Sequence, residues 1–232
     1  MSFVTDHPIN ARWPAETPDL LQLYSFPTPN GIKVSAMLEE TGLPYEWHKV
    51  TLSDEDVKSP EFLSLNPNGK IPAIIDPDGP GGQPLALFES GAILLYLAEK
   101  TGQFLSPDPI RRYQTIQWVM FQMGGIGPMF GQLGWFFAFG GADIEDERPL
   151  ERYQKETIRL LDVLEQRLDG RDWLMDVYSI ADIATAPWMR ALAHYGVQSE
   201  IGWKDRPNVL AWFERFNARP AIQRAINIPP RE

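Results

Sequence analysis

The residues whose chemistry stands out first are Thr28 and Asn30, in the turn Pro27–Gly31. The alternating run Leu20–Phe26 predicts a strand before this turn, and the apolar spacing of Ile32–Glu40 predicts a helix after it. A hydroxyl and a carboxamide therefore lie where the first N–H groups of a helix lack intrahelical partners. Such a place favours a negative charge, and a thiolate is one. The alternative is that Thr28 or Asn30 only caps the helix.

A second pair of polar residues, Glu89 and Ser90, falls between a predicted strand, Pro84–Phe88, and a predicted helix, Ser90–Lys100. The Ser90 hydroxyl and the N–H groups of the helix would bind a carboxylate, and Glu89 would accept a hydrogen bond from an ammonium group. The alternative is that Ser90 is an ordinary N-cap.

A third feature is Ile71-Pro72, which opens the predicted strand 71–75. Proline cannot donate to a strand ladder, so it must face an edge or a ligand. If the bond is cis, the N–H and C=O of Ile71 turn outward, where an extended peptide can pair with them as an added strand. The alternative is a trans proline at a strand start. A ligand with an ammonium, a carboxylate, a peptide stem and a thiol would satisfy all three features together.

The composition limits the source of any reactive sulfur. The chain has no cysteine, so sulfur chemistry must use a sulfur atom that a ligand brings. The histidines His7, His48 and His194 lack metal-ligand spacing, and no metal site is predicted. With 31 acidic residues against 21 basic ones, the formal charge is −10, which argues against nucleic acid or an anionic membrane as partner.

One uncharged stretch, Tyr113–Ala142, is long enough to cross a membrane. Four glutamines, seven glycines and Pro128 interrupt it, so it predicts helices around a pocket or interface and not a membrane span. The first residues show no basic segment followed by an apolar one, so no secretory signal is predicted and the cytoplasm is the default location.

The order of the elements predicts two regions. From Leu20 to about Thr101, strands and helices alternate in the order βαβ, ββα, which implies a small sheet with helices on its faces. After a predicted linker, Ser106–Pro109, nearly everything is helical apart from an irregular Gly/Phe section that ends at Phe139. Residues 1–18 lack a sustained period and are predicted to form an N-terminal extension. Trp13 would anchor this extension against the body of the protein or against a neighbouring subunit, and the alternative is that the extension is disordered. The predicted helices after the linker are Arg111–Met123, Arg148–Leu168, one that a capping box at Ser179–Asp182 begins, and Val209–Asn217.

Several of these segments together resemble the glutathione transferase family. The Thr-Pro-Asn turn and the stretch Gly124–Met129 are most similar to its bacterial Nu class, the disulfide-bond reductases related to a yeast prion regulator. The resemblance covers about residues 20–225. It implies an α/β thioredoxin-like N-terminal domain, 19–105, followed by an all-α C-terminal domain, 109–232, assembled as a homodimer. The segments that carry it are Pro27–Gly31, Asn68–Ala73, Phe88–Glu99 and Ser179–Ile183.

The resemblance also implies roles for the residues of the site. Thr28 and Asn30 would flank the sulfur of bound glutathione, and Ile71, before cis-Pro72, would pair with its cysteinyl backbone. Glu89 and Ser90 would hold its γ-glutamyl end.

Two further assignments have alternatives. Arg152 would reach glutathione in the neighbouring subunit's site, unless it only belongs to a solvated helix face with Glu156 and Arg159. Relatives carry glutamine or histidine for the glycyl end of glutathione between residues 50 and 60. Here the nearest residues are Val57 and Lys58, and Lys58 would meet the carboxylate as a point charge.

The predicted function is therefore reduction of small disulfides by glutathione, with the sulfur held as a thiolate by Thr28 and Asn30. Tyr24, in the preceding strand, is the rival activator. Conjugation of apolar electrophiles is the alternative reaction, for which the Trp/Phe/Met-rich stretch Trp118–Phe139 would line the pocket. A non-catalytic regulatory or scaffold module is a third possibility. Whether one or two glutathiones occupy each site is left open.

Overall fold

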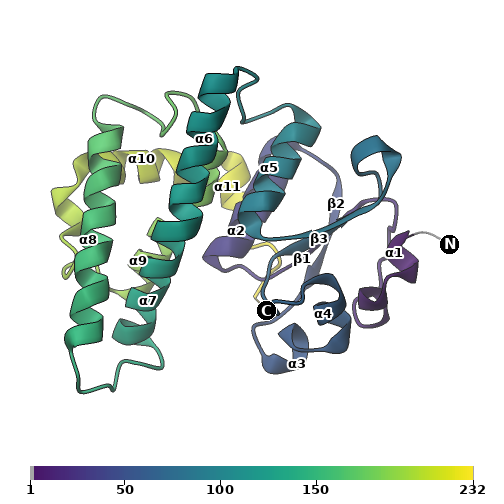
Figure 1. Ribbon diagram of the computed structural model, residues 1–232, viewed down its shortest axis with the longest axis horizontal. Coiled ribbons are helices and arrows are strands. Elements are labelled where there is room, and N and C mark those ends of the chain that lie inside the picture. The colour runs from purple at the N-terminus through teal and green to yellow at the C-terminus, as the bar shows by residue number, and fades with distance from the viewer. Residues whose placement is uncertain (1–2, 232) are drawn as a thin grey trace. The chain divides into compact units, whose positions relative to one another are not determined.

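The structure is a computed structural model that describes residues 3–231. The chain divides into two compact units (Figure 1). The first holds Met1–Thr101 together with Pro220–Glu232, and the second holds Gly102–Arg219. The first unit is an α/β structure and the second is helical, which confirms the predicted fold class.

The first unit is built on a four-stranded sheet in the order β2-β1-β3-β4. Strands β1 and β2 are parallel, and the β1–β3 and β3–β4 pairs are antiparallel. Strands β1, β3 and β4 overlap the predicted segments 20–26, 71–75 and 84–88, whose β-branched and other apolar residues fit a pleated surface. The strands are β1 (Leu21–Ser25), β2 (Tyr45–Lys49), β3 (Ala73–Asp76) and β4 (Leu85–Phe88).

Two helices pack together along one face of the sheet, α2 (Pro29–Thr41) and α5 (Ser90–Thr101) (Figure 1). Helix α2 begins at the predicted turn and ends at Gly42, whose left-handed backbone closes the helix. A short C-terminal helix, α11 (Pro220–Ala225), packs on α2, and the Ser35 hydroxyl donates to the Ala225 carbonyl at 2.9 Å.

The other face of the sheet packs on a cluster of buried apolar side chains, which we call the core cluster. It joins side chains of β1 and β3 to two short helices, α3 (Asp54–Val57) and α4 (Pro60–Leu65). The turn between β3 and β4 contains a 3-10 turn, Pro80–Gly82. The buried members of the cluster are Val4, Ile9, Tyr24, Val50, Val57, Phe62, Leu65, Ile71, Ala73 and Ile75.

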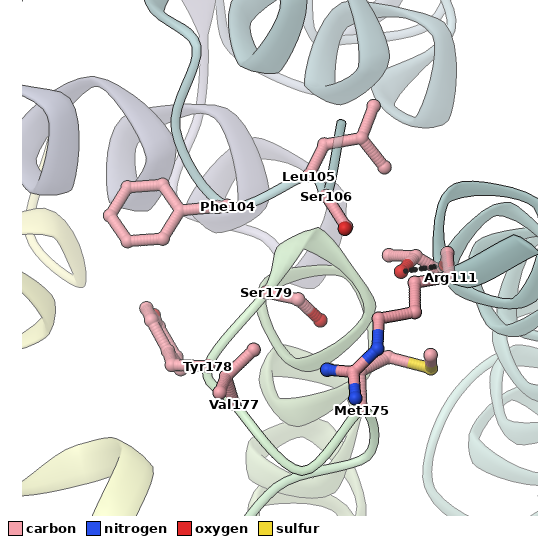
Figure 2. Close-up of a pocket in the computed structure, with 9 residues that line it drawn as sticks. Phe104, Leu105, Ser106, Arg111, Met175, Val177, Tyr178 and Ser179 are labelled. Atoms are coloured by element: carbon pink, nitrogen blue, oxygen red, sulfur yellow. Dashed lines mark hydrogen bonds between the residues drawn. The ribbon is translucent and has the colours of Figure 1, made fainter. Parts of the chain in front are cut away.

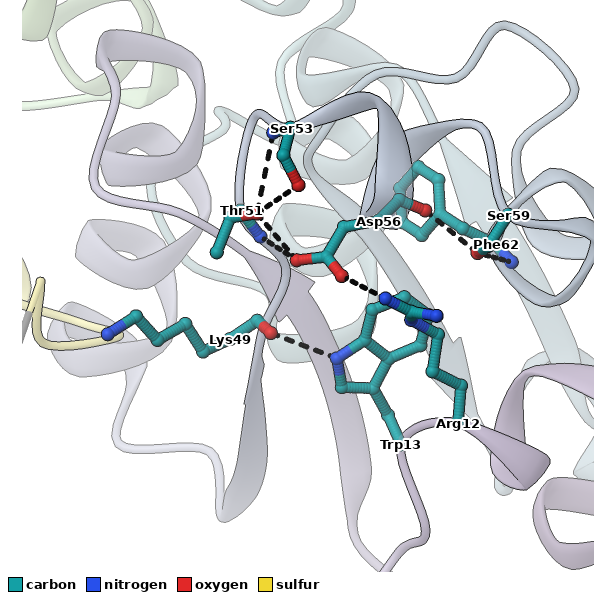
Figure 3. Close-up of polar contacts among 8 residues, drawn as sticks. All are labelled: Arg12, Trp13, Lys49, Thr51, Ser53, Asp56, Ser59 and Phe62. Atoms are coloured by element: carbon teal, nitrogen blue, oxygen red, sulfur yellow. Dashed lines mark hydrogen bonds and ion pairs between the residues drawn. The ribbon is translucent and has the colours of Figure 1, made fainter.

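The N-terminal extension is part of this core. It forms a short helix, α1 (Phe3–Asp6), and a 3-10 turn, Pro8–Ala11. The Trp13 indole donates to the Lys49 carbonyl at 2.9 Å, and Arg12 pairs with Asp56 at 2.6 Å (Figure 3). The Trp13 anchor expected from the sequence is therefore present, and it holds the segment against its own unit.

The second unit contains five α-helices of eight or more residues within the described chain. The prediction of an irregular section before Phe139 was wrong, because residues 122–138 are helical. The elements are α6 (Pro109–Phe121), a π-helical turn (Gln122–Ile126), α7 (Gly127–Ala138), α8 (Arg148–Leu168), α9 (Ile180–Tyr195), a 3-10 turn (Trp203–Asp205) and α10 (Pro207–Asn217).

The core of the second unit follows the predicted amphipathic pattern. Helix α8 buries Leu160, Leu161, Leu164 and Leu168 and packs against α7 and α10. The predicted capping box is present at the start of α9, where Ser179 and Asp182 bond each other's backbone. In the described part of the chain, no helix has the length and apolarity that a bilayer crossing requires.

Candidate active site

The strand pairing brings the predicted site segments to one end of the sheet. Tyr24 pairs with Ala73 in antiparallel register, so the chain that follows β1 lies at the same end as the chain that precedes β3. Ala73 also pairs with Phe88 in antiparallel register, which brings the residues after β4 to that end. Strand β2 runs parallel to β1, so residues after Lys49 begin there too. The Thr28 turn, Ile71-Pro72 and Glu89-Ser90 therefore gather from three separate parts of the chain.

Thr28 is the N-cap of α2. Its backbone is extended, with φ −92° and ψ 170°, and its hydroxyl oxygen accepts from the Gly31 N–H at 3.3 Å. Asn30 follows within the first turn of the helix and is half-buried. The capping alternative for Thr28 is thus real, but it uses the hydroxyl as an acceptor and leaves the hydroxyl proton available to a ligand.

Gly31 allows the turn to lie close to the preceding strand. A Cβ at Gly31 would lie 1.9 Å from the Phe26 carbonyl oxygen and 2.6 Å from Ser25 Oγ. Only glycine fits here, because both contacts are far shorter than a van der Waals contact. The residue therefore holds the start of α2, with Thr28 and Asn30, tightly against the end of β1.

Ile71-Pro72 is a cis peptide, as the resemblance implied. The paired residues of β3 begin at Ala73, so Ile71 precedes the ladder. Glu89 is exposed and has a positive φ of 73°, which is rare for a residue with a side chain. Its carbonyl accepts the first helical bond of α5, from the N–H of Ile93 at 2.9 Å.

Ser90 is the first residue of α5, and its side chain is buried. Its hydroxyl oxygen accepts from the Lys33 ammonium at 3.2 Å. Lys33 lies on α2 and is fully buried, whereas the sequence pattern predicted only that it belongs to a helix. The sequence did contain one indication that Lys33 lies near the site. Lys33 follows Asn30 by three residues, so the two residues share a face of the helix.

Tyr24, the rival activator, is not placed to act. It is fully buried in the core cluster and stacks on His48 with ring centroids 4.6 Å apart. Within the described residues its hydroxyl meets no hydrogen-bond partner. Burial, followed by the negative charge of Glu46, raises the pKa of Tyr24 well above its ordinary value, so a tyrosinate is not available at neutral pH.

Two predicted residues make surface ion pairs. Lys58 is exposed and its ammonium pairs with Asp54 at 2.6 Å, so its role toward a glycyl carboxylate stays a prediction. Arg152 lies in the second unit and is 68% exposed, with its guanidinium 3.7 Å from Glu156, which also binds Arg159. The solvated helix face is thus present in the single chain, and the role of Arg152 in a neighbouring subunit also stays a prediction.

A separate recess of about 240 Å³ lies within the second unit. Figure 2 shows the Arg111 side chain extended toward Met175, with the rings of Phe104 and Tyr178 on the opposite side. None of the predicted glutathione contacts lines this recess. Its lining residues are Phe104, Leu105, Ser106, Arg111, Thr115, Met175, Val177, Tyr178 and Ser179.

Curated relatives match along most of the chain. It is 47% identical over 209 residues to the disulfide-bond oxidoreductase YfcG of Escherichia coli, an alignment that covers 89% of this chain and 94% of that protein. It is 38% identical over 214 residues to the disulfide-bond oxidoreductase YghU of the same organism, covering 88% and 73%.

Solved structures match equally well. A glutathione transferase from Pseudomonas putida, with one glutathione disulfide bound per subunit, has a TM-score of 0.96 and 56% identity over 99% of this chain and 100% of that chain. One from Burkholderia graminis, with two glutathione molecules bound per subunit, has a TM-score of 0.97 and 59% identity over 100% and 98%.

Family models give the same result. The N-terminal domain of glutathione S-transferases matches residues 20–99, and the C-terminal domain of glutathione S-transferases matches residues 127–220. Together with the segments that gather at one end of the sheet, these matches identify the chain as a member of the glutathione S-transferase family.

Proposed function

We propose that the protein is a glutathione-dependent disulfide-bond oxidoreductase that reduces small disulfides. The observation that carries the proposal is the gathering of Thr28, Asn30, Ile71 and Ser90 at one end of the sheet in a chain without cysteine. These groups match the thiol, the peptide stem and the γ-glutamyl end of glutathione. The names of the two Escherichia coli relatives support the same reaction.

Neutral donors are sufficient to hold the glutathione sulfur as a thiolate. A free thiol has a pKa of about 8.5, and lowering it to about 6.5 takes about 2.7 kcal/mol. One hydrogen bond to a charged group supplies about 1.5–3 kcal/mol, and a helix N-terminus supplies about 0.3–1 kcal/mol. The side chains of Thr28 and Asn30, at the start of the 13-residue helix α2, therefore suffice without a cationic or tyrosinate activator.

The reaction then proceeds by two exchanges. The bound thiolate attacks one sulfur of the substrate disulfide, forms a mixed disulfide and expels the other half as a thiolate, which takes a proton from water. A second glutathione thiolate attacks the glutathione sulfur of the mixed disulfide and releases the second substrate thiol. Two glutathiones are oxidised to glutathione disulfide, and one substrate disulfide is reduced to two thiols.

We also propose that both glutathiones bind in one site and that the protein is a cytoplasmic homodimer. The solved relatives hold either glutathione disulfide or two glutathiones per subunit, which are the product and the paired reactants of this sequence. Arg152 would contact glutathione across the subunit interface, and Lys58 would meet the glycyl carboxylate.

The test is turnover of 2-hydroxyethyl disulfide by the purified protein with glutathione, coupled to glutathione reductase. We expect rapid disulfide reduction and slow conjugation of chlorodinitrobenzene. The reverse result would establish the conjugating reaction instead. Isothermal titration with glutathione separates both from a scaffold, which would give no heat of binding.

A further inference from the structure

A fully buried lysine lies directly behind the predicted γ-glutamyl site. Lys33 has no exposed surface, although lysine is almost never fully buried unless it is paired, because its ammonium loses hydration. It lies on α2, and its ammonium reaches across to the first residue of α5. Lys33 therefore places a cationic group behind the Ser90 hydroxyl, which we assign to binding the γ-glutamyl end of the ligand.

In its charged form, Lys33 can only donate in its contact with Ser90. An ammonium group has donors and no acceptor, so Lys33 Nζ donates to Ser90 Oγ across 3.2 Å. The Ser90 hydroxyl can then donate its proton only to a group other than Lys33. Because Ser90 opens α5, a carboxylate placed there would also meet the N–H groups of that helix.

We propose that Lys33 is a positioning residue for the α-carboxylate of the γ-glutamyl group of glutathione. It orients the Ser90 hydroxyl toward the ligand, and its charge offsets that of the carboxylate. Glu89, the next residue, accepts the α-ammonium group. The inference rests on the proposed function, because it names how one end of that ligand is recognised.

The surrounding charges agree with this role. The pKa of Lys33 is lowered to about 7, because the effect of burial outweighs the opposing effect of the negative charge of Glu89. The charged groups elsewhere on the packed helices have ion pairs or lie at the far ends. Glu39 of α2 pairs with Arg224 of α11, and Lys100 of α5 pairs with Asp76; Glu40 and Glu99 lie near the C-terminal ends of α2 and α5.

A bound carboxylate favours the charged form of Lys33 and so raises its pKa. Affinity for the ligand is then greatest below the pKa of the free protein, about 7, and falls as the pH rises above it. S-methylglutathione is the suitable probe, because it has no thiol to titrate.

The experiment compares two ligands by isothermal titration, S-methylglutathione and the same compound with γ-aminobutyrate in place of γ-glutamate, which lacks the α-carboxylate. We expect Lys33→Met to lower the affinity for S-methylglutathione about 10- to 100-fold. The affinity for the analogue, which binds more weakly, should stay unchanged. Lys100→Met, which removes a lysine from the same unit, is the matched control and should change neither. Equal weakening of both ligands by Lys33→Met would overturn the proposal, since it would mean a structural role.

A measurement on the unaltered protein covers the case in which the variant does not fold. S-methylglutathione affinity should fall between about pH 6 and about pH 8, while affinity for the analogue should stay flat. Equal profiles for the two ligands would overturn the role of Lys33. If the unaltered protein binds S-methylglutathione with no such pH dependence but reduces disulfides, only this inference fails. If it neither binds glutathione nor reduces disulfides, the proposed function fails as well.

Discussion

The two residues assigned to the sulfur differ in what their side chains already do. Thr28 Oγ1 accepts the Gly31 N–H at 3.3 Å and caps α2, so its loss affects the helix as well as the ligand. Asn30 brings a carboxamide with two N–H donors to the first turn. We expect Asn30→Ala to lower kcat/KM for 2-hydroxyethyl disulfide about 10- to 100-fold, and Thr28→Ala to lower it less.

Stability separates these two effects. Thr28→Ala should also reduce the free energy of unfolding by about 1 kcal/mol, because it removes an N-cap. Asn30→Ala should reduce stability less, because Asn30 lies within the first turn and is not the N-cap. The ultraviolet absorbance of the bound thiolate, titrated against pH, reports the sulfur directly. Equal losses of rate in both variants would show that the two residues share the role.

Gly31 is a position where one methyl group decides whether the site forms. Because the added Cβ of Gly31→Ala would lie 1.9 Å from the Phe26 carbonyl oxygen, we expect a loss of about 3 kcal/mol or more in urea unfolding. Gly42→Ala is the control. Gly42 has a φ of 69° and no heavy atom near its added Cβ. Gly42→Ala should therefore lower the free energy of unfolding by only about 1 kcal/mol. Similar costs at both positions would contradict the close approach.

His48 links stability to pH. It is buried against Tyr24, and its Nε2 lies 2.8 Å from Gln22 Oε1. Burial lowers its pKa below 6.5, although the nearby Glu46 opposes this in part. A lowered pKa means that the stabilising contribution is present above about pH 6.5 and is lost as the pH falls through the folded-state pKa.

We therefore expect the free energy of unfolding to decline below about pH 6.5, and the decline to be smaller in His48→Gln. Urea unfolding over a pH series measures both. His194→Gln, in the second unit, is the comparison. An unchanged decline in His48→Gln would assign the acid sensitivity to other groups.

At the scale of elements, the start of α9 depends on one buried carboxylate. Asp182 accepts from the Leu174 N–H at 2.9 Å, the Trp212 indole at 2.8 Å and the Ser179 N–H at 3.0 Å. Burial raises its pKa to about 6, although each of these donors favours the charged form. Asp182→Asn turns an acceptor into a donor that faces other donors. We expect it to cost about 3 kcal/mol in thermal unfolding, against about 1 kcal/mol for Ser179→Ala. Similar losses would mean that the cap alone matters.

The elements that the sequence predicted well are those whose pattern is local. Alternation located β1, the Pro- and Gly-rich turns located β3 and β4, and the Ser179–Asp182 spacing located α9. The section after Met123 was missed because glycine has poor helix propensity, whereas here glycines allow close packing. An added Cβ at Gly134 would lie 2.4 Å from Tyr195. The N-terminal segment could not be predicted from a local pattern, because it is held in place by contacts with residues distant in sequence, such as that of Trp13 with Lys49.

For the site, the chain order and the motifs predicted which segments meet, because antiparallel neighbours bring strand ends together. Lys33 was not predicted. A lysine on a helix normally faces solvent, and only the packing of α2 against α5 buries it next to Ser90. Whether Arg152 completes the site depends on a second subunit.

A mixed dimer tests that last dependence at the scale of the whole molecule. If Arg152 acts in the neighbouring subunit's site, then pairing an Asn30→Ala subunit with an Arg152→Ala subunit places both losses in one site and leaves the other site intact. The mixed dimer, purified with two different tags, should then recover about half of the unaltered activity per dimer. Each homodimeric variant should remain slower.

If Arg152 acts only on its own chain, each site of the mixed dimer carries one loss, so its activity cannot exceed the mean of the two homodimeric variants. Arg159→Ala is the matched control, since Arg159 binds the same Glu156 at 2.6 Å. Paired with Asn30→Ala, it should give about half of the unaltered activity whichever way Arg152 acts, provided that Arg159→Ala is active by itself. Recovery with Arg152→Ala, which is slow by itself, therefore distinguishes a residue shared across the dimer from one on a solvated helix face.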